Sequence, residues 1–281
     1  MLRENNPRTF FFLSLFFVLF VLFLYGPTIT ITILSFQGPT GGLVFPMRGT
    51  SLHWFGQVFQ AQSIGDIHGS FFRSIQLGLI VTVLTMVLSF LAGLAFRYRF
   101  RGSGFLFYVV VASLIMPSVV VSLGIGSLFE LLGIERFWWN AGLGAHLTWT
   151  LPFGLLIMFA VFNRFDKRLE EAARDLGASG VQTVRYVILP IVASSLIGVG
   201  LFGFTLSYDE LARSSQAMGA LNTLPLELQA MQTNATTPVI YALGTMTTAL
   251  SLSVIGVCLG TVLLLQRRQA RKGSDAGKGT V

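Results

Sequence analysis

The chain has 281 residues, of which 53% are hydrophobic and only 11% are charged, so it is too apolar for an ordinary soluble domain. A net charge of +7 would suggest nucleic-acid binding in a soluble protein, but here the apolar residues fall in long blocks that indicate membrane spans. With Cys258 as its single cysteine, the chain has neither an internal disulfide nor a thiolate metal site. We therefore predict one all-α polytopic membrane domain over residues 1–281, without a nucleic-acid partner.

Six blocks are long enough to cross a bilayer, because about 20 apolar residues span the hydrocarbon core and only a helix satisfies its own backbone there. The first block is longer than the apolar region of a signal peptide and lacks a small-residue cleavage site, so we expect it to be retained. The predicted spans are residues 10–36, 74–96, 105–132, 143–163, 190–208 and 238–265. Residues 267–281 are predicted to form a disordered basic tail.

The basic residues orient these spans. Of the 19 Lys and Arg residues, all but Arg48, Arg73, Arg136 and Arg213 lie in segments on one side of the predicted bilayer. The positive-inside rule places that side in the cytoplasm, together with both termini. An even number of spans also requires both termini on one side, which agrees.

The outer loop over residues 37–73 contains a short segment in which Leu52, Phe55 and Phe59 share a helical face. We expect this segment to lie at the membrane interface. His146 falls near the outer end of the fourth span, where we expect a polar contact between helices. The three histidines are too far apart in sequence to suggest a metal site, and we predict none.

The inner loop over residues 164–189 is the most polar part of the chain between two spans. Residues 168–176 predict a helix that places Leu169, Ala172 or Ala173, and Leu176 on one apolar stripe. Glu170 and Glu171 lie four and three residues before Arg174, spacings that favour pairing on a solvated helix.

The same loop carries stop and start signals. Gly177 supplies the backbone freedom that a helix end requires, and Ser179 with Gln182 forms a predicted capping box for a second helix. Pro190 is tolerated at the beginning of the fifth span. We predict a helix-turn-helix on the inner surface, and periodicity leaves open whether it is a docking surface or only a solvated loop.

The run Glu171-Ala172-Ala173, followed by Gly177 and Leu189-Pro190, resembles the EAA signature of permease subunits of ATP-binding-cassette (ABC) importers. Val187 replaces the Ile of that signature. The resemblance implies the type I importer permease fold (MetI-like) and a coupling helix that docks on a separate ATPase. The residues that it marks for ATPase coupling are Glu170, Glu171, Ala172, Ala173, Arg174, Asp175, Gly177, Ala178, Leu189 and Pro190.

The resemblance also implies partners and a location. We expect a cytoplasmic ATPase dimer that binds ATP and magnesium, so that this chain holds no cofactor and is not an enzyme. A second permease subunit, expected to be a different homologous chain, and an external substrate-binding protein complete the assembly. The location implied is the bacterial inner membrane.

Residues 204–215 and 224–231 are similar to the corresponding region of spermidine/putrescine-type permeases. Asp209 and Glu210 could attract an amine cation, and Tyr208 could add a cation–π contribution of about 0.5–2 kcal/mol. The alternative for this acidic pair is a structural ion pair with Arg213. The alternatives for the whole chain are an ATPase-docking structural subunit, or a permease for an opine, amino-acid derivative, sugar or anion.

Overall fold

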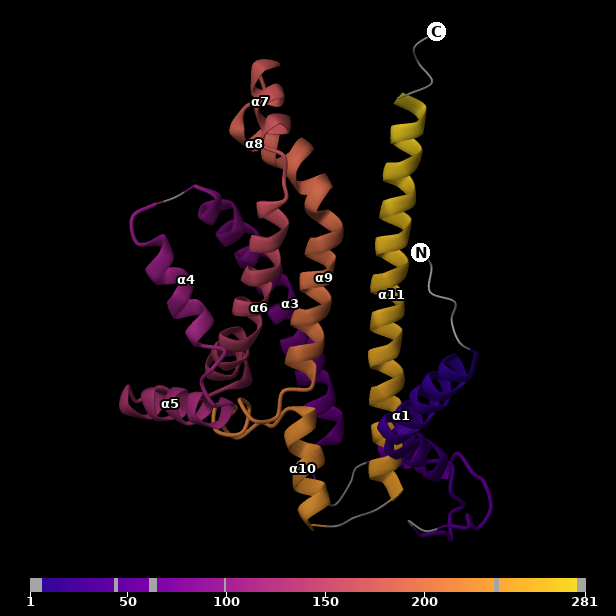
Figure 1. Ribbon diagram of the computed structural model, residues 1–281. Helices are drawn as coiled ribbons and strands as arrows, with labels where there is room; N and C mark the ends of the chain where they lie inside the picture. The colour runs from indigo at the N-terminus through magenta and orange to yellow at the C-terminus, as the bar shows by residue number, and fades with distance from the viewer. Residues whose placement is uncertain (1–6, 43–44, 61–64, 99, 235–237, 277–281) are drawn as a thin grey trace. The chain divides into compact units, whose positions relative to one another are not determined.

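The computed structural model describes residues 7–42, 45–60, 65–98, 100–234 and 238–276 (Figure 1). The chain divides into two units. The first, Met1–Gly65 with Ala230–Leu250, contains α1 (Pro7–Leu34), α2 (His53–Val58) and the beginning of α11 (Pro238–Ala276). The second comprises Asp66–Gln229 and Ser251–Val281. We describe each unit by itself.

The second unit contains most of the helices. They are α3 (Ile67–Arg97), α4 (Ser103–Ala112), α5 (Ser118–Leu131), η1 (Trp138–Gly142), α6 (Leu143–Asn163), α7 (Arg168–Asp175), α8 (Gly180–Thr183), η2 (Val184–Ile188) and α9 (Leu189–Tyr208), together with the first part of α10 (Leu224–Asn234) and the last part of α11. The predicted all-α class is confirmed. Within the described residues, five helical stretches are long and apolar enough to cross a membrane: Arg8–Leu34, Ile67–Arg97, Trp138–Asn163, Gly180–Tyr208 and Pro238–Leu265.

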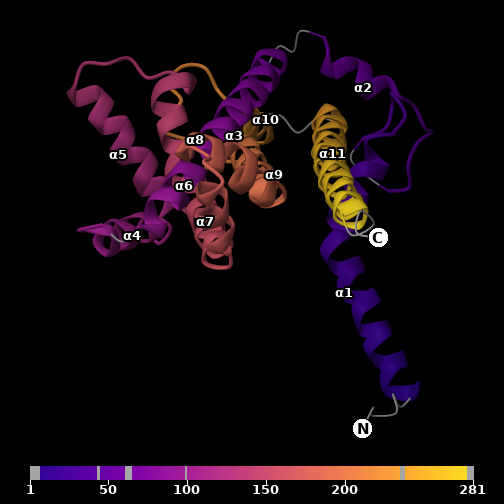
Figure 2. The ribbon, with the colours of Figure 1, turned by 90° about the horizontal axis from the view of Figure 1, so that it is seen from above.

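The predicted third span, residues 105–132, differs from the structure. It is divided into the shorter apolar helices α4 and α5, which lie at one edge of the second unit, beside α3 and α6 (Figure 2). The helix α4 ends at Ala112, and Pro117 precedes the first turn of α5. Proline has no backbone N–H and clashes with the carbonyl four residues earlier, so the helix cannot continue through it without a break.

The last helix also differs from the sequence prediction. We expected a disordered tail from residue 267, but α11 continues to Ala276. Its extension is rich in Gln, Arg, Ala and Lys, which all have favourable helix propensities. The remainder of the predicted tail, residues 277–281, lies outside the described residues.

Three helices, α3, α6 and α9, form the core of the second unit and pack directly against one another. Small residues allow this approach: a side chain added at Gly78 would lie 3.1 Å from the ring of Phe204, and one at Gly93 would lie 2.7 Å from the ring of Phe162. Between α3 and α6, the buried hydroxyl of Thr85 donates to Thr150 at 2.8 Å. Close backbones and interhelical hydrogen bonds of this kind hold membrane helices together.

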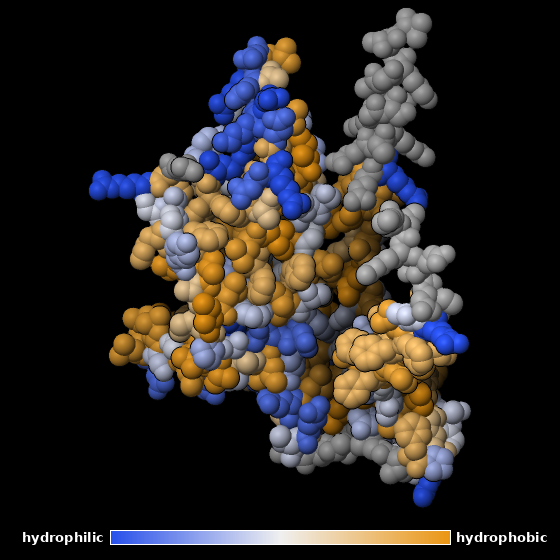
Figure 3. Space-filling model, in the orientation of Figure 1, coloured by the Kyte–Doolittle hydropathy of each residue, from blue (hydrophilic) through white to orange (hydrophobic). Residues whose placement is uncertain are grey.

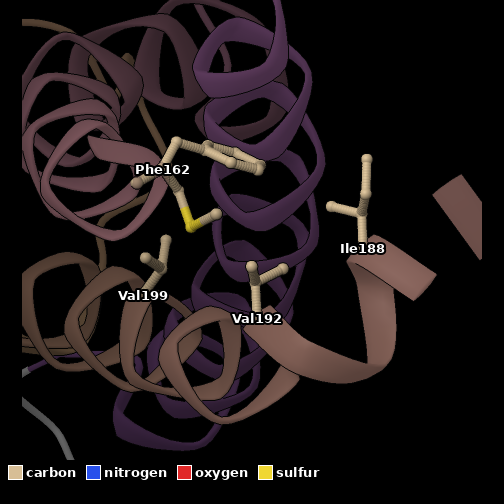
Figure 4. Close-up of a cluster of buried hydrophobic side chains, with 5 residues drawn as sticks. Phe162, Ile188, Val192 and Val199 are labelled. Atoms are coloured by element: carbon tan, nitrogen blue, oxygen red, sulfur yellow. The ribbon is translucent and has the colours of Figure 1, made fainter. Parts of the chain in front are cut away.

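The inner end of this core is apolar and includes the segment that leads into α9. Met158 and Phe162 from α6 meet Ile188, Val192 and Val199 from η2 and α9 (Figure 4). Each of the five is at most 5% exposed. Ile188, the last residue of η2, is therefore packed into the core of the second unit.

A wide helical turn joins that loop to the fifth span. Gly180–Tyr208 is one continuous helix, in which Val184–Ile188 has π-helical hydrogen bonding. Pro190 follows at once, near the beginning of α9. Because proline cannot donate the usual bond to the fourth residue before it, a widened turn at this point lets the helix pass the proline without ending.

The outer segment between α9 and α10 is tied to the core by buried hydrogen bonds. Ser122 of α5 donates to the carbonyl of Arg213 at 2.7 Å and accepts from the N–H of Gln216 at 2.9 Å. Ser74 of α3 accepts from the N–H of Leu224 at 2.8 Å. Polar side chains in the N-terminal parts of α3 and α5 thus fix the path of residues 209–223.

Charged groups strengthen the same junction. Arg73 pairs with Asp66 at 3.0 Å and donates through Nε to the carbonyl of Asn222 at 2.8 Å. Glu227 of α10 accepts from the N–H of Asp66 at 2.9 Å. The pKa of the Asp66 carboxyl is lowered, chiefly because the carboxylate accepts the N–H of Gly69 at the beginning of α3, and also because Arg73 lies beside it.

We predict that Gly154→Ala destabilises the core while Gly144→Ala, in the same helix, does not. A methyl at Gly154 would lie 3.0 Å from both Ser89 Cβ and Thr85 Cγ2, whereas nothing lies within 4 Å of one at Gly144. Overpacking costs about 1–3 kcal/mol, and Gly to Ala in an open helix gains about 0.5–1 kcal/mol. Thermal unfolding in detergent measures both. Equal midpoints for the two variants would contradict the packing described.

Candidate functional site

The polar inner loop begins with α7, and this helix ends as the sequence predicts. Gly177 has a φ of +85°, a value that favours glycine. The N–H of Ala178 donates to the carbonyl of Ala173 at 3.0 Å, and that of Gly177 donates to Arg174 at 2.8 Å. This pair of bonds is a Schellman motif, which satisfies carbonyls at the helix end and turns the chain sharply.

The second predicted signal is also confirmed. The N–H of Gln182 donates to Ser179 Oγ at 3.3 Å, and the N–H of Ser179 donates to Gln182 Oε1 at 2.7 Å. This reciprocal capping box begins α8. The chain therefore forms the expected helix-turn-helix between α6 and α9.

The predicted pairing of Glu170 with Arg174 is wrong. Glu170 is buried, with 7% of the residue exposed, and forms an ion pair with Arg97 at the end of α3. Among the described residues, this pair and Arg73–Asp66 are the two ion pairs. Arg174 remains exposed. Glu170 thus pairs with Arg97, which is distant in sequence but adjacent in space, and not with Arg174 of its own helix.

The apolar stripe of α7 faces away from the chain. Leu169 is 46% exposed and Leu176 is 89% exposed, while Glu170 faces inward. Val181 and Tyr186, which follow in the same loop, are 78% and 67% exposed. Figure 3 shows the hydrophilic residues of α7 and α8 gathered at one end of the unit, with hydrophobic atoms exposed among them. These four exposed apolar side chains of the loop, Leu169, Leu176, Val181 and Tyr186, are together called the loop face below.

The other residues of the EAA-like run lie around this face. Glu171, Ala172, Arg174, Asp175 and Gly177 are exposed, Ala173 and Ala178 are half-buried, and Leu189 and Pro190 are exposed at the beginning of α9. A cavity of about 120 Å³ lies beside α7, lined by Arg97, Tyr98, Lys167, Glu170, Glu171 and Arg174. The loop thus combines a charged hollow with a projecting apolar face.

The predicted pathway residues lie at the outer end of α9, in three different environments. Tyr208 is 6% exposed and its ring stacks on Phe204, with centroids 5.5 Å apart. Asp209 caps the helix with an exposed side chain, and partial desolvation there raises the pKa of its carboxyl. Glu210 is half-buried and its Oε1 accepts from the backbone N–H of Arg213 at 2.8 Å.

Arg213 does not form an ion pair with either carboxylate. It is fully buried, donates to Thr148 Oγ1 at 2.9 Å and lies 4.6 Å from the centre of the Trp149 ring. Burial lowers the pKa of this guanidinium and the Glu210 carboxylate opposes the effect, although an arginine stays protonated in proteins. Neither Asp209 nor Glu210 therefore forms the structural ion pair with Arg213 that the sequence suggested.

His146 makes the expected contact between helices. Its Nδ1 lies 2.8 Å from Ser207 Oγ in α9 and its Nε2 lies 2.9 Å from Ser214 Oγ. Ser214 donates its own hydrogen to the carbonyl of Glu210 at 2.6 Å, so Nε2 is the donor to Ser214. The histidine therefore joins α6, α9 and the outer segment through one chain of hydrogen bonds.

Sequence reasoning missed the roles of Arg97, Arg213 and Trp149. Arg97 was assigned to membrane topology alone, and Trp149 was not connected with the outer segment. The positive charge of each arginine was the signal that could have indicated these roles. An arginine near the end of an apolar span needs a partner, and a nearby aromatic ring or carboxylate can be that partner.

Comparisons with known proteins identify the family of the chain. Residues 85–270 match the family described as binding-protein-dependent transport system inner membrane component. The spermidine/putrescine transport system permease protein PotC of Haemophilus influenzae is 32% identical over 88% of this chain and 94% of its own. The putrescine transport system permease protein PotI of Escherichia coli (strain K12) is 29% identical over 80% of this chain and 81% of its own.

Solved structures show the same fold. A chain from a bacterial ABC transporter involved in the import of the acidic polysaccharide alginate has a TM-score of 0.62 and 18% identity, covering 95% of this chain and 99% of that one. An inward-facing MetNI methionine ABC transporter gives a TM-score of 0.50 at 14% identity, covering 73% of this chain and 93% of that one. The family match covers about two thirds of this chain, and the Haemophilus influenzae relative covers 88% of it at 32% identity. The chain therefore belongs to the inner-membrane components of binding-protein-dependent transport systems, which are the permease subunits of ABC importers.

Proposed function

We propose that this permease forms half of the pathway for polyamines or related small organic cations and is driven by a separate ATPase. The relatives named for spermidine and putrescine transport support the substrate class, since they match over most of both chains. The exposed carboxylate of Asp209 supports it physically, because it offers a negative charge at the outer end of a membrane helix.

The loop face is the observation that supports ATPase docking. Its four apolar side chains project from the most polar end of the second unit, where lipid cannot cover a loop of this charge. Exposed apolar groups rimmed by charges mark protein–protein contacts. Glu171, Ala172, Arg174 and Asp175 provide that rim, and the Schellman turn at Gly177 separates the two short helices so that both can meet one partner.

The proposed assembly joins this permease to several partner proteins. A cytoplasmic ATPase dimer binds ATP and magnesium, while this chain binds neither. A second permease subunit, a different homologous chain, provides the other half of the pathway, and a substrate-binding protein delivers the solute from outside. The loop face and both termini lie on the cytoplasmic side of the bacterial inner membrane, in agreement with the distribution of Lys and Arg.

We predict that Asp209→Asn combined with Glu210→Gln reduces putrescine uptake by about two- to fivefold at low substrate, because exposed ion pairs contribute about 0.2–1 kcal/mol. Both changes remove charge with little change of shape, and the amide introduced at position 210 keeps an oxygen for the N–H of Arg213. Uptake into proteoliposomes containing the ATPase and binding protein measures the effect.

Glu135→Gln is the matched control, because Glu135 is an exposed carboxylate in the segment after α5. It should leave uptake unchanged. Uptake that is identical in the double variant at every putrescine concentration would remove Asp209 and Glu210 from the pathway. Preference of the wild-type complex for a sugar or an inorganic anion over putrescine would instead overturn the substrate class and leave the permease assignment standing.

We predict that Leu176→Ser weakens ATPase binding, whereas Leu131→Ser does not. Leu176 is 89% exposed on the loop face and Leu131 is 84% exposed at the end of α5, so neither change leaves a cavity in this chain. Burying a leucine at an interface contributes about 1.5–3 kcal/mol, equivalent to about a 10- to 100-fold change in affinity. Co-purification of the ATPase with the tagged permease measures the loss. Equal retention by the two variants would mean that the loop face is not the docking surface.

A further inference from the structure

The ion pair between Arg97 and Glu170 joins two elements that are far apart in sequence. Arg97 is the last residue of α3, and Glu170 lies in the first turn of α7. Their side chains are 6% and 9% exposed, so both charges are withdrawn from water. A buried ion pair of this kind is strongly sensitive to the removal of one partner, because the remaining charge is left uncompensated.

Aromatic rings from the end of α6 and from the segment that follows it also contact the arginine. The guanidinium carbon lies 5.2 Å from the centre of the Phe162 ring and 4.9 Å from that of Phe165. Cation–π contacts at these distances favour a guanidinium over an ammonium group, since the planar cation stacks on rings while bonding at its edge. Arg97 therefore contacts α6 and α7 at once while belonging to α3.

The pair also sets the rotation of α7 about its own axis. Glu170 is buried, whereas Leu169 and Leu176, which lie about 100° and about 120° from it around a helix with 3.6 residues per turn, are exposed. Without a partner for Glu170, the more favourable rotation would turn the leucines inward and the carboxylate toward water. The exposed position of the loop face thus depends on a charge at the end of α3.

Chain connectivity shows why this contact matters. α7 is joined through the backbone to α6 on one side and, through α8 and η2, to α9 on the other. α3 packs against both of those helices but has no sequence connection to α7. The Arg97–Glu170 pair provides a direct attachment between them.

We propose that Arg97 is a positioning residue for energy coupling: through Glu170 it holds α7 in the orientation that presents the loop face, and it carries movement of α7 into α3. The proposal rests on the function proposed above. It assigns Glu170 an inward structural role, whereas Glu171, its exposed neighbour, remains with the docking surface.

Charge reversal tests this role. Arg97→Glu and Glu170→Arg should each reduce putrescine taken up per ATP hydrolysed by at least about tenfold, and the double reversal should restore most of the ratio. Arg101→Glu is the matched control, because Arg101 is an exposed arginine in the segment that follows α3, and its reversal should leave the ratio unchanged. A purely structural role would lower the amount of assembled complex and leave this ratio unaltered.

Two further measurements decide the outcome if a single reversal prevents assembly. Recovery of assembly and of the ratio in the double reversal supports the proposal, and a double reversal that remains as defective as the single variants overturns it. Arg97→Lys keeps the charge but stacks less well on Phe162 and Phe165, so it should assemble and lower the ratio by less than Arg97→Glu does. A wild-type ratio in both Arg97→Lys and Arg97→Glu also overturns the proposal.

Measurements on the wild-type complex distinguish a failure of this proposal from a failure of the proposed substrate class. If it takes up no putrescine, the substrate class fails, and stimulation of ATP hydrolysis by the binding protein becomes the readout for the same variants. Loss of that stimulation in Arg97→Glu, with recovery in the double reversal, supports the positioning role. Stimulation that is equal in all variants overturns it.

Discussion

The close contact of α3, α6 and α9 is the constraint on which the rest of this permease depends. Glycines at the crossings let the backbones approach, so polar side chains between the helices are near enough to bond one another. Thr85 meets Thr150, and His146 meets Ser207, in places where lipid could offer no partner. Because these groups have few alternatives, the contacts fix how the three helices are set against one another.

The helix α3 connects this core with both ends of the second unit. At its outer end Arg73 and Ser74 hold the segment between α9 and α10, and at its inner end Arg97 holds Glu170 of α7. Packed rigid helices that carry polar contacts at both ends are suited to transmitting displacement, since a close-packed interior yields little to compression. In the proposed coupling, a displacement of α7 reaches the segment between α9 and α10 through the rigid helix α3 rather than through flexible loops.

The sequence allowed the spans and helix ends to be predicted because each depends on local properties. Long apolar blocks predicted the five described helices that are long enough to cross a membrane, while Gly177 and the Ser179–Gln182 pair marked turns whose hydrogen bonds form within a few residues. The break between α4 and α5 carried a local signal too, in Pro117, but membrane helices often tolerate proline. Whether a proline bends or interrupts a helix depends on neighbouring helices that a single sequence does not locate.

The wrong assignments of side-chain partners have one physical origin. Periodicity shows which residues share a face of a helix but not which face meets the protein, so the Leu169–Leu176 stripe was correctly grouped and its direction was left undetermined. Glu170 and Arg213 were assigned partners near in sequence, and both have partners from distant segments. Arg213 contacts Thr148 and Trp149 of α6 instead of pairing with the nearby carboxylates.

The position of Arg213 bears on the proposed attraction of a cationic solute to the end of α9. A guanidinium beside the pathway would repel an amine cation, but this one is fully buried and covered on one side by Trp149. Asp209 remains exposed, so the carboxylate is the charge in contact with water. If Arg213 were exposed and Asp209 were buried, the charge in contact with water would be positive. The proposed preference for cations therefore depends on the packing of Arg213 under the Trp149 ring as well as on the acidic residues.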